Sequence, residues 1–174
     1  MGCLRTLNMV QRTPRRQGQP KAMVRCPFRD RLSPYPGTDD LLRELERRGT
    51  PTAIATSSGR AGFQVVLDTT ELPSLGTVAI VVTDDDVKNA KPAPDLVSAA
   101  ADKLGVAPDR CLMVGDTPYD GEAATRAGVP FVALATGFHT EAALRAAGAI
   151  QVYSGPGALL EHLDEILRGS PAKR

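Results

Sequence analysis

Residues 111–120 have the sequence CLMVGDTPYD, in which an apolar run ends at Gly115 and two carboxylates follow. A short apolar run of this kind is typical of a strand inside a parallel sheet, where both faces are covered. Asp116 comes where this strand would leave the sheet, and Asp120 follows four positions later. Carboxylate oxygens are preferred ligands of a hard cation such as Mg²⁺, so the pair predicts a cation site. In the structural alternative, Asp116 is a turn residue and Asp120 a helix cap.

Similar apolar runs recur along the chain, with helix-like segments between them. Five runs have the length of strands: residues 52–55, 78–82, 111–114, 131–134 and 150–153. Residues 78–82 are apolar throughout, which predicts a strand covered on both faces. Alternating strands and helices indicate βαβ units. The sequence therefore predicts an α/β fold, a Rossmann-like three-layer sandwich with a mostly parallel sheet.

Polar groups directly after strands are informative, because parallel α/β sheets bind ligands at the carboxyl ends of their strands. Thr56 and Ser57 follow the run at 52–55, and their hydroxyl and backbone N–H groups suit an anionic oxygen. A turn that caps the next helix is the alternative there. Lys91 lies in the proline-stiffened sequence KPAPD, where an ammonium group would neutralise a phosphate. A solvated surface lysine is the alternative.

Three ring-bearing residues also follow strand ends, namely Tyr119, Phe138 and His139. Packing within turns is their expected role, and contact with a substrate is the alternative.

Taken together, these motifs resemble the haloacid dehalogenase superfamily of phosphohydrolases. The most specific elements are KPAPD at 91–95, VGDTPYD at 114–120 and AGV at 127–129. The stretch VTDDDV at 82–87 is similar to phosphoglycolate-phosphatase-like members, and the likeness covers residues 34–167. The resemblance implies a Mg²⁺-dependent phosphatase of small phosphorylated metabolites. Its mechanism would be in-line transfer of phosphate to an aspartate, followed by hydrolysis of the aspartyl-phosphate by water.

The resemblance also implies roles for individual residues. Thr56 would hydrogen-bond the transferring phosphoryl group, and Ser57 would add a backbone donor. Lys91 would steady the phosphate and the nucleophile. Asp116 would ligate Mg²⁺, while Asp120 would support the metal site, directly or through water.

The central motif of that family does not occur before Thr56. The motif is Asp-x-Asp-x-Thr at the end of the first strand, and its first Asp attacks phosphorus while its second acts as general acid and base. We therefore expect no nucleophile and no turnover in this chain. The Asp84-x-Asp86 sequence follows an apolar run, but it would serve as nucleophile only in a permuted chain order; a polar loop is the alternative.

The family's first strand lies between the strands that lead to Thr56 and Asp116. Its absence predicts a core with a gap of about 9–10 Å between those neighbours. The helical cap that precedes the segment at Pro34 in family members is missing as well. We expect either the carboxyl-terminal part of a truncated phosphatase or a non-catalytic protein that binds phosphate, Mg²⁺ or a partner.

Charge divides the chain into unequal parts. Residues 1–31 hold eight Lys and Arg and one Asp, net +7, whereas the rest holds 13 basic and 19 acidic groups, net −6. We expect a basic segment at 1–31 that is disordered or misassigned, an incomplete core at 32–168, and a tail at 169–174. The basic segment has one aromatic residue, Phe28, and so lacks the stacking groups of a nucleic-acid binder. No nucleic-acid partner is expected.

The overall composition is that of a globular protein, with 42% hydrophobic and 24% charged residues. The sequence has no apolar run long enough to span a bilayer, so no membrane partner is expected. Its three cysteines are odd in number and lack metal-ligand spacing, which fits a reducing cytoplasm. The oligomeric state is left open.

Overall fold

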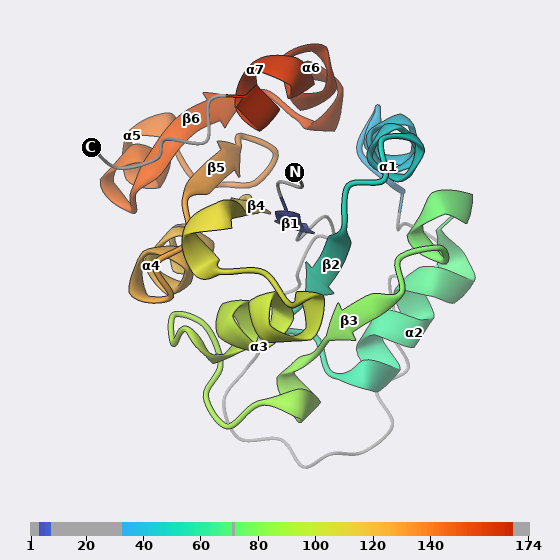
Figure 1. Cartoon of the computed structure of the whole chain (residues 1–174), viewed down its shortest axis with the longest axis horizontal. Coiled ribbons are helices and arrows are strands. Elements are labelled where there is room, and N and C mark those ends of the chain that lie inside the picture. The colour runs from blue at the N-terminus through green and yellow to red at the C-terminus, as the bar shows by residue number, and fades with distance from the viewer. Residues whose placement is uncertain (1–3, 8–32, 71, 169–174) are drawn as a thin grey trace.

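A parallel sheet runs through the middle of the molecule (Figure 1). The computed structural model describes residues 4–7, 33–70 and 72–168. The strands are β1 (Leu4–Leu7), β2 (Thr52–Ala55), β3 (Ile80–Val82), β4 (Cys111–Gly115), β5 (Phe131–Leu134) and β6 (Ala149–Tyr153). Their order across the sheet is β3-β2-β1-β4-β5-β6, and every neighbouring pair is parallel.

Helices cover both faces of this sheet (Figure 1). They are α1 (Thr38–Arg47), α2 (Arg60–Thr69), α3 (Asp95–Leu104), α4 (Pro118–Arg126), α5 (Glu141–Ala146), α6 (Pro156–Glu161) and α7 (Leu163–Arg168). Buried side chains of α1, α2, α6 and α7 form one apolar cluster, and those of α3, α4 and α5 pack in two others. The predicted α/β three-layer fold with a parallel sheet is therefore confirmed.

The strands supply both apolar layers because successive side chains point to opposite faces. In β4, Leu112 and Val114 join the cluster under α1, whereas Cys111 and Met113 join the cluster under α4. All five residues of β4 are buried. This explains why its sequence is a continuous apolar run rather than an alternating one.

The predicted gap beside β2 and β4 is filled, so the expectation of a core without a central strand is wrong. Leu4–Leu7 pair with β2 on one side and with β4 on the other, with Leu7 in register with Ile54 and Val114. Strand pairing needs only backbone N–H and C=O groups, so a segment without an apolar pattern can occupy the position. These four residues thus belong to the sheet. The other residues of the basic segment, 1–3 and 8–31, and the tail at 169–174 lie outside the described residues.

Strand β3 differs from its prediction in length and in surroundings. It begins at Ile80 rather than at residue 78, and it forms an edge of the sheet. Only Val82 is fully buried, because the first part of the run lies at the periphery. An apolar run therefore indicated that a strand is present, but it did not show that helices cover its whole length.

Candidate phosphate and cation site

The carboxyl ends of β2 and β4 bring the predicted site residues to one edge of the sheet. Thr56 follows β2, Asp116 follows β4, and Asp120 lies in the first turn of α4. Lys91 belongs to the loop that precedes α3. We refer to Thr56, Ser57, Lys91, Asp116 and Asp120 as the candidate site.

Lys91 and Asp120 form a buried ion pair. The Lys91 Nζ lies 2.8 Å from Asp120 Oδ1, and both side chains are only 1% exposed. The same Nζ donates a second hydrogen bond to the backbone oxygen of Ala55, at 2.9 Å. Lys91 therefore connects the end of β2 to the start of α4. The alternative of a solvated surface lysine is wrong.

The second oxygen of Asp120 caps the helix. Asp120 Oδ2 accepts hydrogen bonds from Thr117 N at 3.1 Å and from Thr117 Oγ1 at 2.7 Å. The Asp120 N–H donates to Thr117 Oγ1 in return, which completes a capping box at the start of α4. Asp120 therefore caps α4 with one carboxylate oxygen and contacts Lys91 with the other.

A glycine makes this close packing possible. A Cβ atom on Gly115 would lie 2.7 Å from the Asp120 Cβ, closer than carbon atoms approach without displacement. Gly115 ends β4, so the start of α4 can turn back against the strand.

Asp116 is a largely buried carboxylate that forms no ion pair within the described part of the chain. Burial raises its pKa to about 6, and repulsion from the Asp120 carboxylate acts in the same direction. Its own backbone N–H, Lys91 and His139 act in the opposite direction. The loop after β5 lies against this carboxylate, because a Cβ on Gly137 would be 3.3 Å from Asp116 Oδ2. Asp116 is therefore an acidic group that a cation would stabilise.

Thr56 and Ser57 offer hydroxyl groups at the end of β2. Thr56 is buried, its N–H donates to Val82 O, and its Oγ1 accepts from the Ser58 N–H at 3.1 Å. This last bond forms a turn within the segment, but the turn does not cap α2, whose N-cap Gly59 has no side-chain capping bond. The Ser57 Oγ is buried and has no hydrogen-bond partner among the described residues. A buried hydroxyl without a partner is uncommon in folded proteins and is consistent with a site for a ligand oxygen.

The acidic stretch after β3 serves as a cap for α2. Asp85 Oδ2 accepts from the Arg60 N–H at 2.8 Å, and Asp86 Oδ1 pairs with the Arg60 guanidinium at 2.6 Å. Asp86 Oδ2 also accepts from the N–H and hydroxyl of Thr83. This stretch follows the edge strand β3, and its carboxylates are used in local structure, which agrees with the polar-loop alternative.

The loop that carries Lys91 is held by two contacts that the sequence did not reveal. Arg126, at the end of α4, donates from Nη1 to the Pro92 backbone oxygen at 2.8 Å. Asp95, the first residue of α3, accepts hydrogen bonds from the backbone and side-chain nitrogens of Asn89 in the same loop. Arg126 also pairs with Glu122 at 3.1 Å, four positions earlier on the surface of α4.

One of the three ring-bearing residues after strand ends differs from its expected role. Phe138 is fully exposed, at 103%, and Tyr119 is 53% exposed. Packing within the turn is therefore wrong for Phe138, because no described residue covers its ring.

Among the described residues, no group of three or more His, Cys, Asp or Glu side chains is placed to hold a metal ion. The described part of the chain also contains no helix with the length and hydropathy needed to cross a membrane.

Comparison with known proteins identifies the family. Residues 17–134 match the family of haloacid dehalogenase-like hydrolases, so the chain belongs to that family. It is similar to the phosphoglycolate phosphatase of Escherichia coli (strain K12), with 32% identity over 105 residues that make up 60% of this chain and 41% of the relative.

Two crystal structures are similar to the fold. A hydrolase from Pseudomonas syringae is 38% identical with a TM-score of 0.75, over 80% of this chain and 66% of that one. A family hydrolase from Deinococcus radiodurans R1, solved with bound phosphate and sodium, is 28% identical with a TM-score of 0.71, over 82% of this chain and 63% of that one. The chain thus spans about two fifths of the curated relative and somewhat less than two thirds of the structural ones.

Proposed function

We propose that the candidate site binds the phosphate group of a small phosphorylated metabolite together with Mg²⁺, as in a family phosphatase, but that this chain does not hydrolyse the ester. The observation that carries the proposal is the buried lysine at the strand ends, Lys91, with Thr56 and Asp116 on the adjacent loops. Burying an ammonium group costs free energy even when the group is paired, and a phosphate site requires a fixed positive charge, so phosphate binding accounts for this lysine. The phosphate bound in the Deinococcus radiodurans relative supports the same class of ligand.

Each residue has a role in this proposal. The Thr56 hydroxyl and the Ser57 backbone N–H donate to phosphate oxygens, and Lys91 neutralises their charge. Asp116 fits a Mg²⁺ ligand, because its carboxylate is desolvated and forms no ion pair within the described residues. Asp120 supports the site through Lys91 and through water, since its oxygens already accept hydrogen bonds from Lys91 and Thr117. When bound, Mg²⁺ would neutralise charge on the phosphate oxygens.

Hydrolysis requires a nucleophile that the sequence does not supply at the expected place. The strand between β2 and β4 has the sequence LRTL, and the first acidic residue after it is Asp30. We therefore propose a non-catalytic role for this chain, in which phosphate and Mg²⁺ bind without turnover. A phosphatase in which a longer product supplies the aspartate is the second candidate, favoured by the relative that is a phosphoglycolate phosphatase.

Calorimetry and a phosphatase assay on the same 174-residue protein test the proposal. We expect inorganic phosphate to bind in the presence of Mg²⁺, and no Mg²⁺-dependent phosphate release from p-nitrophenyl phosphate. Asp116→Ala should remove Mg²⁺ binding, whereas Asp109→Ala, at an exposed turn before β4, should not. Absence of binding by the unmodified protein would overturn the binding role. Turnover that Asp116→Ala abolishes would instead establish the phosphatase.

A further inference from the structure

Two exposed rings lie beside the candidate site. Phe138 and Tyr119 are two of the three large hydrophobic residues that are exposed in the described part of the chain. Single exposed apolar residues are common on protein surfaces, so exposure alone carries little information. These two differ from the third, Ile150 on the edge strand β6, because both follow the carboxyl ends of neighbouring strands. Tyr119 lies in the first turn of α4, after β4, and Phe138 lies in the loop after β5.

Both residues belong to segments that adjoin Asp116. Tyr119 is the third residue after Asp116 and directly precedes Asp120 in α4. On the other side, Gly137 approaches the Asp116 carboxylate so closely that a Cβ atom there would lie 3.3 Å from Oδ2. Phe138 is the next residue, so its ring projects from a backbone that touches the candidate site.

The loop that carries Phe138 is fixed rather than loosely attached. The Tyr35 hydroxyl donates a hydrogen bond of 2.7 Å to the backbone oxygen of Thr136, two residues before Phe138. Tyr35 comes from the segment before α1, so a hydrogen bond from outside the loop holds it beside Asp116. A ring that is exposed on a fixed backbone loses little conformational freedom when it binds a ligand.

We infer that Phe138 and Tyr119 form a contact surface for the organic group of a phosphate ester whose phosphate binds at the candidate site. This inference rests on the proposed function and adds the class of ester. An aryl or other flat apolar group would bury the exposed rings, so we expect esters with such a group to bind more tightly than esters with a short organic group. A carboxylate on the organic group would have no counter-ion among the described residues of the candidate site, because its one cation, Lys91, already contacts Asp120 and would face the phosphate.

Calorimetric titration of the full chain with three ligands, in the presence of Mg²⁺, tests this inference. Inorganic phosphate reports on the anion site itself, and methyl phosphate and phenyl phosphate differ only in their organic group. We expect phenyl phosphate to bind about tenfold more tightly than methyl phosphate, as burial of much of one ring would give. Phe138→Ala should bring this ratio close to one, and Tyr119→Ala should lower it. Ile150→Ala is the matched control, since it removes an exposed apolar side chain elsewhere, and it should leave the ratio unchanged.

The outcomes separate the inference from the proposed function. If none of the three ligands binds, the proposed function fails and the inference fails with it. If phosphate binds but the phenyl-to-methyl ratio is near one, or does not respond to Phe138→Ala, the inference alone is wrong. Sedimentation velocity adds a further check: a dimer that Phe138→Ala dissociates, without any change in ligand preference, would show that the rings contact a second copy instead.

Discussion

Replacing Asp116 by Asn should stabilise the protein at neutral pH. The pKa of Asp116 is raised from its ordinary value of 3.8 to about 6 in the folded protein. Between pH 4 and pH 6 the folded state therefore keeps a proton that the unfolded chain has lost. The free energy of unfolding consequently falls as pH rises through this window. The difference between the two pKa values corresponds to about 3 kcal/mol, which is the largest gain that Asn can give above pH 6.

Urea denaturation of both proteins between pH 4 and pH 8, in the presence of EDTA, measures this effect. The quantity to follow is the difference in free energy of unfolding between Asp116→Asn and the unmodified protein, because contributions from other groups cancel in it. We expect a difference near zero at pH 4 that rises to about 2–3 kcal/mol above pH 6.5. Asp109→Asn, at an exposed turn, is the matched control and should leave the profile unchanged.

Two results would refute the reasoning. A difference that is constant across the pH range would mean that Asp116 titrates alike in the folded and unfolded states. A loss of stability at pH 7 would mean that the carboxylate makes favourable contacts that Asn cannot make. Added Mg²⁺ provides an independent check, since a cation bound to Asp116 should stabilise the unmodified protein but not the variant.

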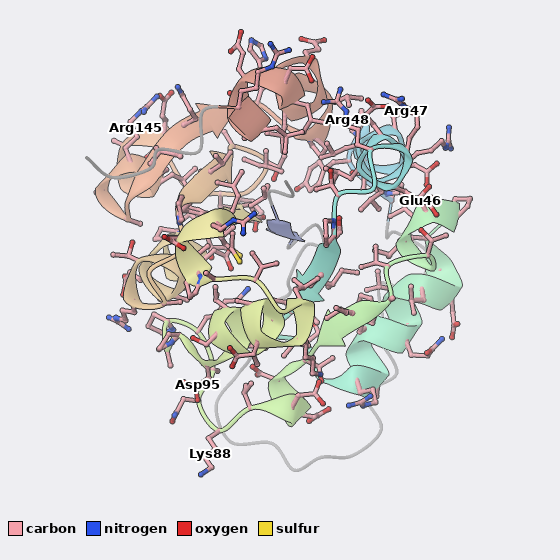
Figure 2. All side chains as sticks on the ribbon, viewed as in Figure 1. Glu46, Arg47, Arg48, Lys88, Asp95 and Arg145 are labelled. Carbon is pink, nitrogen blue, oxygen red and sulfur yellow. The ribbon has the colours of Figure 1, made fainter. Side chains whose placement is uncertain are left out.

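Two further predictions concern the support of the site. Lys91→Met should lower the free energy of unfolding by about 3–5 kcal/mol, because it leaves the buried Asp120 carboxylate without its counter-ion. Lys88→Met, on the same loop, should change it very little, since Lys88 points into solvent (Figure 2). Chemical denaturation measures both variants. Arg126→Ala should weaken phosphate binding severalfold with little change in melting temperature, because it releases the backbone next to Lys91. Arg145→Ala removes a similar exposed ion pair along a helix and should leave the phosphate affinity measured by calorimetry unchanged. Equal effects of the two variants would contradict a positioning role for Arg126.

The sequence predicted most of the sheet because strands buried on both faces leave a strong signal. The apolar runs at β4 and β5 were placed correctly, since every residue of these strands is buried. Strand β1 was not predicted, because its position depends on backbone pairing with β2 and β4 rather than on a side-chain pattern. A four-residue segment that contains Arg5 has no periodicity from which a strand could be identified.

The sequence predicted where the residues of the candidate site lie, but not which of them contact one another. A parallel sheet brings the residues after its strands to one edge, so Thr56 and Asp116 were expected close together. The ion pair joins residues 29 positions apart, and whether Lys91 contacts Asp120 depends on how the loop before α3 packs on α4. That packing uses the contact between Arg126 and a backbone oxygen, which leaves no distinctive signal in the sequence.

The electrostatics of the site favour a particular order of binding. Burial raises the pKa of Asp116, and the Lys91–Asp120 pair is removed from solvent, so both features cost free energy in the folded protein. Ionised Asp116 and Asp120 together outweigh the single charge of Lys91, so the candidate site is negative when Asp116 is deprotonated. A phosphate dianion would therefore be repelled until a divalent cation reverses the local charge. We accordingly expect Mg²⁺ to bind first, and the phosphate affinity to fall at least tenfold in EDTA; equal affinity with and without the cation would show that Lys91, Thr56 and Ser57 suffice on their own.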